Sequence, residues 1–203
     1  MKIEFHFDFG SPNAYLSHLV IPEIESRTGS RFDYVPVLLG GVFKLTNNAS
    51  PAETLAGIKN KTEYQEIETQ RFLEKNKIRS FKRNPFFPVN TLKIMRGAVS
   101  LLGTDQFSYY VDEIFKHMWA DPKKMDEDEV LMKALQSSQL PGREILESIT
   151  RPDVKNHLIE LTSQSVERGT FGSPTFFVDN EIFFGKDRLQ DLEHTIKTRR
   201  REV

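Results

Sequence analysis

The stretch IEFHFDFGSPNAYL, residues 3–16, decides how the fold begins. Apolar and polar side chains alternate over residues 3–9, and this period of two predicts a β-strand that Gly10 ends. Ser11 is a favourable N-cap, and Pro12 suits the first helical position because its missing N–H would have no partner there. We therefore expect a strand, a tight turn and a helix that ends near Gly29.

The rest of the chain falls into two zones. The segment RFDYVPVLLGG, residues 31–41, has strand character, and residues 42–150 then carry helical signals almost throughout. SPAE at residues 50–53 matches a capping box, and apolar stripes at helical spacing lie within residues 111–118 and 130–135. After a helix that Pro152 begins, residues 169–196 indicate a strand, an Asp-Asn turn, a strand and a helix capped by Asp187.

This order of elements predicts an α/β protein, namely a thioredoxin-like fold with a large inserted all-helical domain. We expect residues 1–41 and 151–203 to form the thioredoxin-like domain and residues 42–150 to form the inserted helical domain. The segment FKRNPFFPVNTL, residues 81–92, is too rich in proline to be regular. The basic segment KTRRREV, residues 197–203, is expected to fray.

Composition narrows the function classes. The 203 residues include 28 Lys and Arg against 29 Asp and Glu, so the formal net charge is -1 and no general field attracts nucleic acid or an anionic membrane. The sequence has no cysteine, which excludes disulfide exchange and nucleophilic catalysis by a thiol of its own. The first residues alternate in hydropathy and do not form the apolar run of a signal peptide, so we expect a cytoplasmic protein.

Four ordered motifs carry a resemblance to a known family. They are FDFGSPNAYL at residues 7–16, PVLLGGVFK at 36–44, NPFFPVNTLKIMR at 84–96 and GTFGSPTFFVDNEIFFGKDRL at 169–189. With them the chain resembles 2-hydroxychromene-2-carboxylate isomerases and, more distantly, kappa-class glutathione transferases, both relatives of the bacterial disulfide oxidoreductases with an inserted helical domain. The resemblance extends over almost the whole chain, and it implies a homodimer.

Ser11 occupies the position at which a redox thioredoxin fold places its nucleophilic cysteine, at a helix N-terminus that favours an anion. Residues 11–14 are Ser-Pro-Asn-Ala, so neither position of a Cys-x-x-Cys pair supplies sulfur. The resemblance implies that glutathione supplies it and that the Ser11 hydroxyl donates to the thiolate, which lowers the pKa of the thiol. On the residues alone, the alternative is that Ser11 only caps its helix.

The resemblance also implies which residues hold reduced glutathione. Ser173 and Pro174 would be joined by a cis peptide bond, which leaves the backbone N–H and C=O of Ser173 free to pair with the cysteinyl part of glutathione. Lys186 and Asp187 are assigned to the γ-glutamyl end, and Asn48 and Lys61 to the glycyl end. On the residues alone, a proline at a strand start, a loop amide and a solvated helix lysine are the alternatives.

The second substrate is expected to be a small aromatic compound with a carboxylate. The candidates for an apolar wall around it are Phe43, Phe86 and Phe87. The candidates to bind the carboxylate are Arg83, Asn84 and Arg96. The implied activity is a glutathione-dependent cis-trans isomerisation of 2-hydroxychromene-2-carboxylate-type compounds to trans-o-hydroxybenzylidenepyruvate, in the degradation of aromatic hydrocarbons.

Other functions remain open on the sequence. A kappa-like transferase would conjugate glutathione to small electrophiles, and net loss of free thiol would distinguish it from an isomerase. A thioredoxin-fold peptide binder would use the backbone edge beside Pro174. A serine hydrolase is disfavoured because the chain has no G-x-S-x-G elbow. The acidic run at residues 126–129 is expected to be a solvated helix turn, so we predict no metal site.

Overall fold

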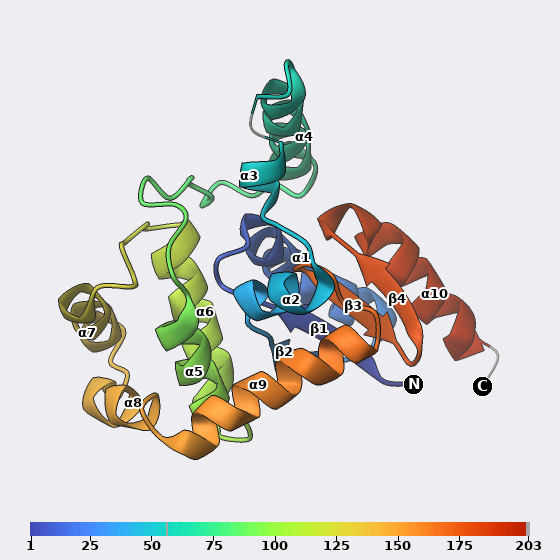
Figure 1. Cartoon of the computed structure of the whole chain (residues 1–203). Helices are drawn as coiled ribbons and strands as arrows, with labels where there is room; N and C mark the ends of the chain where they lie inside the picture. Colours follow the sequence, from blue (N-terminus) through green and yellow to red (C-terminus); the bar gives the residue numbers. More distant parts are fainter. Residues whose placement is uncertain (56, 202–203) are drawn as a thin grey trace.

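The computed structural model describes residues 1–55 and 57–201 (Figure 1). In this part of the chain, one mixed sheet has the strand order β2-β1-β3-β4. Its strands are β1 (Ile3–Phe7), β2 (Asp33–Pro36), β3 (Thr175–Val178) and β4 (Glu181–Phe184). β1 pairs in parallel with β2 and antiparallel with β3, and β3 pairs antiparallel with β4. The sheet therefore combines a β-α-β unit with a C-terminal hairpin, which is the predicted thioredoxin-like arrangement.

Helices surround this sheet and form most of the middle of the chain. In chain order they are α1 (Pro12–Thr28), α2 (Leu39–Thr46), α3 (Pro51–Thr54), α4 (Lys61–Lys75), α5 (Leu92–Ser100), α6 (Phe107–Trp119), α7 (Asp128–Ser137), α8 (Gly142–Ser148), α9 (Pro152–Glu167) and α10 (Leu189–Arg201), with a 3-10 turn η1 (Lys186–Arg188) before α10. Figure 1 shows α3 and α4 standing out from the rest. One buried apolar cluster joins the sheet to α5 and α6, so the division into two domains stays a prediction.

β1 is buried on both faces, although its sequence alternates between apolar and polar residues. One face packs on the apolar cluster that includes residues of α1 and α6. On the other face, His6 Nδ1 lies 2.7 Å from Ser165 Oγ of α9, and Glu4 pairs with Arg168, which follows α9. Only 2% of His6 and 3% of Glu4 is exposed, because α9 covers the face that would otherwise meet water.

Two predictions about the ends of elements need correction. β1 ends at Phe7 and not at Phe9, because Asp8 already begins the turn: its carbonyl accepts from Ser11 N at 3.1 Å. α10 continues to Arg201 and is not frayed over residues 199–200, since Arg199 and Arg200 donate to the carbonyls of Val178 and Thr28. Residues 202–203 lie outside the described residues. Within those residues, we find no helix with the length and hydrophobicity that crossing a membrane requires.

Candidate active site

Ser11 lies at the start of α1 in the extended backbone conformation of an N-cap, with φ -91° and ψ 115°. Its Oγ accepts from Ala14 N at 3.2 Å and donates to Ser173 O at 2.8 Å. A hydroxyl has a single hydrogen, so the carbonyl of Ser173 takes the only one that Ser11 can donate. Ser11 therefore caps its helix and also contacts the segment that the resemblance assigns to glutathione.

The Ser173-Pro174 peptide bond is cis, as the resemblance implies. The Ser173 carbonyl already accepts one hydrogen bond, from the Ser11 hydroxyl, and its second lone pair is what it could offer a ligand. Pro174 O accepts from Gly185 N at 2.9 Å, which ties this segment to the turn at residues 186–188. Hydrogen bonds therefore connect Ser11 through residues 173–174 to the position just before Lys186.

Lys186 and Asp187 lie in η1, and Asp187 does not cap the final helix as predicted. The turn begins at Gly185 without a side-chain cap, and the Asp187 carboxylate instead accepts from Lys186 Nζ at 2.6 Å. The Lys186 side chain is 5% exposed and its Nζ lies 4.8 Å from the centroid of the Phe72 ring, whereas 70% of the Asp187 side chain is exposed. The ammonium thus has one carboxylate partner and one aromatic face.

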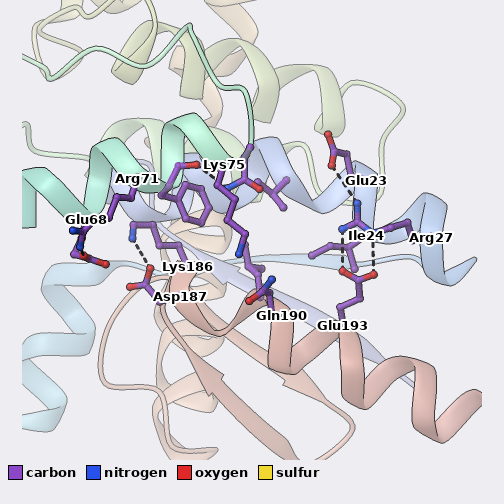
Figure 2. Close-up of a pocket in the computed structure, with 14 residues that line it drawn as sticks. Glu23, Ile24, Arg27, Glu68, Arg71, Lys75, Lys186, Asp187, Gln190 and Glu193 are labelled. Carbon is purple, nitrogen blue, oxygen red and sulfur yellow. Dashed lines mark hydrogen bonds and ion pairs between the residues drawn. The ribbon is translucent and has the colours of Figure 1, made fainter.

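A groove of about 400 Å³ lies between α1, α4 and the η1–α10 segment (Figure 2). Basic and acidic side chains both line it. The basic ones are Arg27, Arg71, Lys75 and Lys186, and the acidic ones are Glu23, Glu68, Asp187 and Glu193. Such a groove suits a ligand that carries charges of both signs. Ser11 is not part of its lining; what connects the two is the set of hydrogen bonds from Ser11 to Ser173 and from Pro174 to Gly185, next to Lys186.

The two residues predicted for the glycyl end lie in different surroundings. Asn48 follows α2, and its Nδ2 donates at 2.9 Å to the carbonyl of Phe171, two residues before Ser173. Lys61 begins α4 and is exposed. Within the described residues, no hydrogen bond or ion pair joins Lys61 to the segment around Ser173. The fold therefore brings Asn48 to the site, while Lys61 belongs to the α3–α4 arm.

Asn84 has a different environment from the one predicted. Its Nδ2 donates to the carbonyls of Met118 and Lys123, both at 3.1 Å, and its Oδ1 accepts from Phe86 N at 2.9 Å. Both amide hydrogens are therefore used, and the residue is 5% exposed. A direct contact between Asn84 and a substrate carboxylate is not supported. The side chain instead fixes the irregular segment that carries Phe86.

The other substrate candidates are more accessible. Phe86 and Phe87 are 48% and 41% exposed, and Phe43 is half-buried in α2. Arg83 is paired with Glu66 of α4. Arg96 is half-buried in α5, and its Nε is buried without a hydrogen-bond partner within the described residues. Arg83 is thus engaged by a carboxylate of α4, whereas the Nε of Arg96 has no such partner within the described residues.

Periodicity and capping rules did not single out two residues that hold the loop before Ser11. The indole Nε1 of Trp119 donates to Phe9 O at 2.7 Å across the fold. The Asp8 carboxylate accepts from Gly10 N and Leu39 N, and burial raises the pKa of Asp8. The available signals were the single tryptophan of the sequence and an acidic residue at the end of a buried strand.

Within the described residues, no histidine forms a hydrogen bond with the Ser11 side chain. Both hydrogen bonds of that side chain go to backbone atoms. His18, on the same helix, lies instead against the Tyr34 hydroxyl at 2.9 Å and Asp112 at 3.1 Å. Within the described residues there is no cluster of His, Cys, Asp and Glu that could hold a metal ion.

The fold and the site together define a thioredoxin-fold protein with serine in place of the nucleophilic cysteine. Residues 2–197 match the model of the DsbA-like thioredoxin domain, and the chain belongs to that family. A 2-hydroxychromene-2-carboxylate isomerase from Sphingobium xenophagum is 28% identical over 197 residues, which cover 94% of this chain and 95% of that protein. Glutathione S-transferase kappa 1 from Homo sapiens is 23% identical over 207 residues, with coverage of 96% and 90%.

A solved structure agrees with these sequence matches. The structure of a 2-hydroxychromene-2-carboxylate isomerase superposes with a TM-score of 0.85 at 23% identity, over 100% of this chain and 97% of that one. The resemblance predicted from the four motifs is therefore confirmed. The names of these relatives support an enzyme with a function in the isomerase and glutathione transferase group.

Proposed function

We propose that this protein is a glutathione-dependent isomerase that converts 2-hydroxychromene-2-carboxylate-type compounds to trans-o-hydroxybenzylidenepyruvate in aromatic hydrocarbon degradation. The observation that carries the proposal is the 2.8 Å hydrogen bond from Ser11 Oγ to Ser173 O. It puts a hydroxyl donor against the backbone segment that precedes a cis proline. The relatives named as isomerases support the reaction, and those named as kappa-class glutathione transferases support the cofactor.

The residues present fit glutathione in their chemistry. Its cysteinyl backbone needs a peptide edge, which Ser173 offers, and its thiolate needs a neutral donor, which Ser11 offers. Its γ-glutamyl end carries both an ammonium and a carboxylate, and Asp187 and Lys186 are a matching pair. We assign the glycyl carboxylate to Asn48 and Lys61. When bound, glutathione supplies the nucleophilic sulfur that lets a conjugated double bond become transiently single and rotate.

The task of the chain is to hold that sulfur as an anion. The Ser11 hydroxyl would turn from the neutral carbonyl of Ser173 to the thiolate, because a hydrogen bond to a charged acceptor is about twice as strong as a neutral one. The N-terminus of α1 adds a favourable field at the same place. Ser11 itself stays neutral throughout, so its role is that of a donor and not of a nucleophile.

The aromatic substrate is assigned to the side of the site that α2, α5 and residues 84–88 form. Phe43 and the exposed Phe86 would contact its ring, and Arg96 would bind its carboxylate with the guanidinium that has an unused buried Nε. Asn84 would act here only through the segment it fixes. We further propose that the enzyme is a cytoplasmic homodimer, as the resemblance implies; light scattering after gel filtration tests the dimer.

Calorimetric titration with reduced glutathione and with S-methyl glutathione tests the cofactor separately from the substrate. We expect both to bind, and only the first to support isomerisation of 2-hydroxychromene-2-carboxylate, followed by absorbance. Absence of heat with both ligands at millimolar concentration would remove the proposal.

A kappa-like transferase is the second candidate, and it is favoured by the human and Caenorhabditis elegans kappa-class relatives. The two activities differ in their products. An isomerase returns glutathione unchanged, whereas a transferase consumes it. Titration of free thiol before and after turnover decides between them.

A further inference from the structure

Asp8 follows β1 directly and is 0% exposed, yet it carries a carboxyl group. Its Oδ1 accepts from Gly10 N at 2.8 Å, and its Oδ2 accepts from Leu39 N at 2.7 Å. Burial raises the pKa of Asp8, and the N–H groups of Leu39 and Gly10 and the Thr91 side chain oppose that rise. The two N–H donors bind two different oxygens, so both acceptor atoms of the carboxyl group are in use.

The backbone of Asp8 holds two further segments. Its N–H donates to Ser173 Oγ at 3.1 Å, and its carbonyl accepts from Ser11 N at 3.1 Å. Asp8 therefore contacts the turn before α1, the start of α2 and the residue before the cis proline. Each of these three segments supplies a group to the site: Ser11, the helix that carries Phe43, and the carbonyl of Ser173.

The turn at Gly10 packs closely against the Asp8 side chain. A Cβ at Gly10 would lie 3.2 Å from Asp8 Oδ1 and 3.1 Å from Thr91 Cγ2, which is tighter than ordinary side-chain contact. By contrast, a Cβ at Gly40 would have nothing within 4 Å. The Asp8 carboxyl group and the turn at Gly10 thus meet without spare space.

Within the described residues, Asp8 has no ion-pair partner, and it is bound by N–H groups and a hydroxyl residue. A buried carboxylate without a cation is costly, and a neutral amide of the same size would avoid that cost. An amide, however, has only one acceptor oxygen for the two N–H donors. The geometry therefore calls for a side chain with two acceptor oxygens at this position.

We propose that Asp8 is a positioning residue that sets the Ser11 hydroxyl relative to the carbonyl of Ser173, by joining the turn at Gly10 to the start of α2 and to Ser173. The inference rests on the proposed function for its chemical consequence, because the activated group is the thiol of bound glutathione. Asp8 does not touch that thiol and acts only through the place of Ser11.

The test compares Asp8→Asn with Glu4→Gln. Glu4 is also a carboxylate on β1 and is 3% exposed, but its partners are Lys2 and Arg168, away from Ser11. Both variants should lose thermal stability. Only Asp8→Asn should raise the thiol pKa of bound glutathione, measured by ultraviolet absorbance, and lower kcat by about 10- to 100-fold with little change in KM. A thiol pKa equal to that of wild type, or an equal change in Glu4→Gln, would overturn the proposal.

Gly10→Ala is a second variant in case Asp8→Asn does not fold, with Gly40→Ala as its control. Gly10→Ala should raise the thiol pKa of bound glutathione, and Gly40→Ala should leave it unchanged; equal values in the two variants would contradict the proposal.

Amide hydrogen exchange tests the positioning role without glutathione. Exchange at Gly10, Ser11 and Leu39 should become faster in Asp8→Asn and not in Glu4→Gln. If wild type does not bind glutathione, the proposed function fails, and unchanged exchange would show that the positioning role fails as well.

Discussion

The hydroxyl of Ser11 and the carbonyl of Ser173 are joined by a hydrogen bond of 2.8 Å, although the two residues are 162 positions apart in the chain. The serine keeps its capping bond to Ala14 N at the same time. An oxygen can accept and donate together, so the two roles of Ser11 do not compete. Two acceptors do compete for the single hydroxyl hydrogen of Ser11. The acceptor is the Ser173 carbonyl in this structure, and it would be the glutathione thiolate in the proposed complex.

Ser11→Ala should therefore separate capping from activation. The cap contributes about 1 kcal/mol, so the melting temperature should fall by a few degrees while the fold persists. The thiol pKa of bound glutathione should rise towards that of free glutathione, and turnover should fall with it. Ser17→Ala is the matched control, because Ser17 lies in the same helix and donates only to Asn13 O. Equal thiol pKa values in Ser11→Ala and wild type would show that Ser11 is not the activating donor.

Ser11→Cys tests the place of the sulfur. Oxidised glutathione should form a mixed disulfide with this variant, since the serine oxygen is proposed to contact the glutathione sulfur. Mass spectrometry should show one added glutathionyl group, formed faster than on Ser108→Cys, which puts a thiol on an exposed position of α6. Faster or equal modification of the Ser108→Cys control would place the glutathione sulfur away from Ser11.

Asp187→Asn tests the γ-glutamyl end. Within the described residues Asp187 makes no capping bond, but its carboxylate is the partner of the buried Lys186 ammonium, so some loss of stability is expected; the amide oxygen can still accept from Lys186 Nζ, which limits that loss. Affinity for glutathione should fall by roughly 1 to 3 kcal/mol, because the substitution removes the charge that would bind the ammonium. Asp191→Asn is the control, since Asp191 is an exposed acid in the next turn that pairs with Arg188. A dissociation constant that does not change in Asp187→Asn would exclude this assignment.

His6 makes stability depend on pH. Burial lowers its pKa from 6.5 to about 4, so the unfolded chain binds a proton that the folded chain does not in this range. The free energy of unfolding is therefore highest, as far as His6 is concerned, above pH 6.5, and it falls as the pH is lowered towards 4. The total change is on the order of 3 kcal/mol. Chemical denaturation at several pH values should show this slope. His6→Asn should be less stable at neutral pH but flatter over the window, whereas His157→Asn, an exposed histidine, should keep the slope.

The Glu4 carboxyl acts in a lower window. Burial opposes its charge, but hydrogen bonds from Arg168 and Lys2 outweigh that effect and hold its pKa at about 2. The ionised Glu4 carboxylate therefore stabilises the folded state above pH 4.5, and this stabilisation is lost as the pH falls from 4.5 towards 2. A slope between pH 6.5 and 4.5 that persists in His6→Asn would contradict the assignment of that window to His6.

The sequence by itself determined the local elements around the site. The alternation of apolar and polar residues predicted β1, and the Ser-Pro pair predicted the start of α1. The end of α1 was predicted near Gly29, which is its C-cap and has a φ of 65°. The Asp-Asn turn at residues 179–180 predicted the β3–β4 hairpin. All of these depend on interactions between residues a few positions apart, which periodicity and capping rules describe directly.

Only the tertiary structure decided what each polar group binds. The Asp8 carboxyl group accepts from Leu39 N, and the Trp119 indole donates to the Phe9 carbonyl. The Asn84 amide donates to backbone carbonyls in α6 and just after it. The Asp187 carboxylate pairs with Lys186 instead of capping α10. Most of these hydrogen-bond partners lie on different helices or strands, and for Asp187 the ion pair replaces a local cap. The packing of the whole chain determines which donor reaches which acceptor. Pattern rules cannot determine that choice, since burial makes every unpaired polar group costly wherever its partner lies in the sequence.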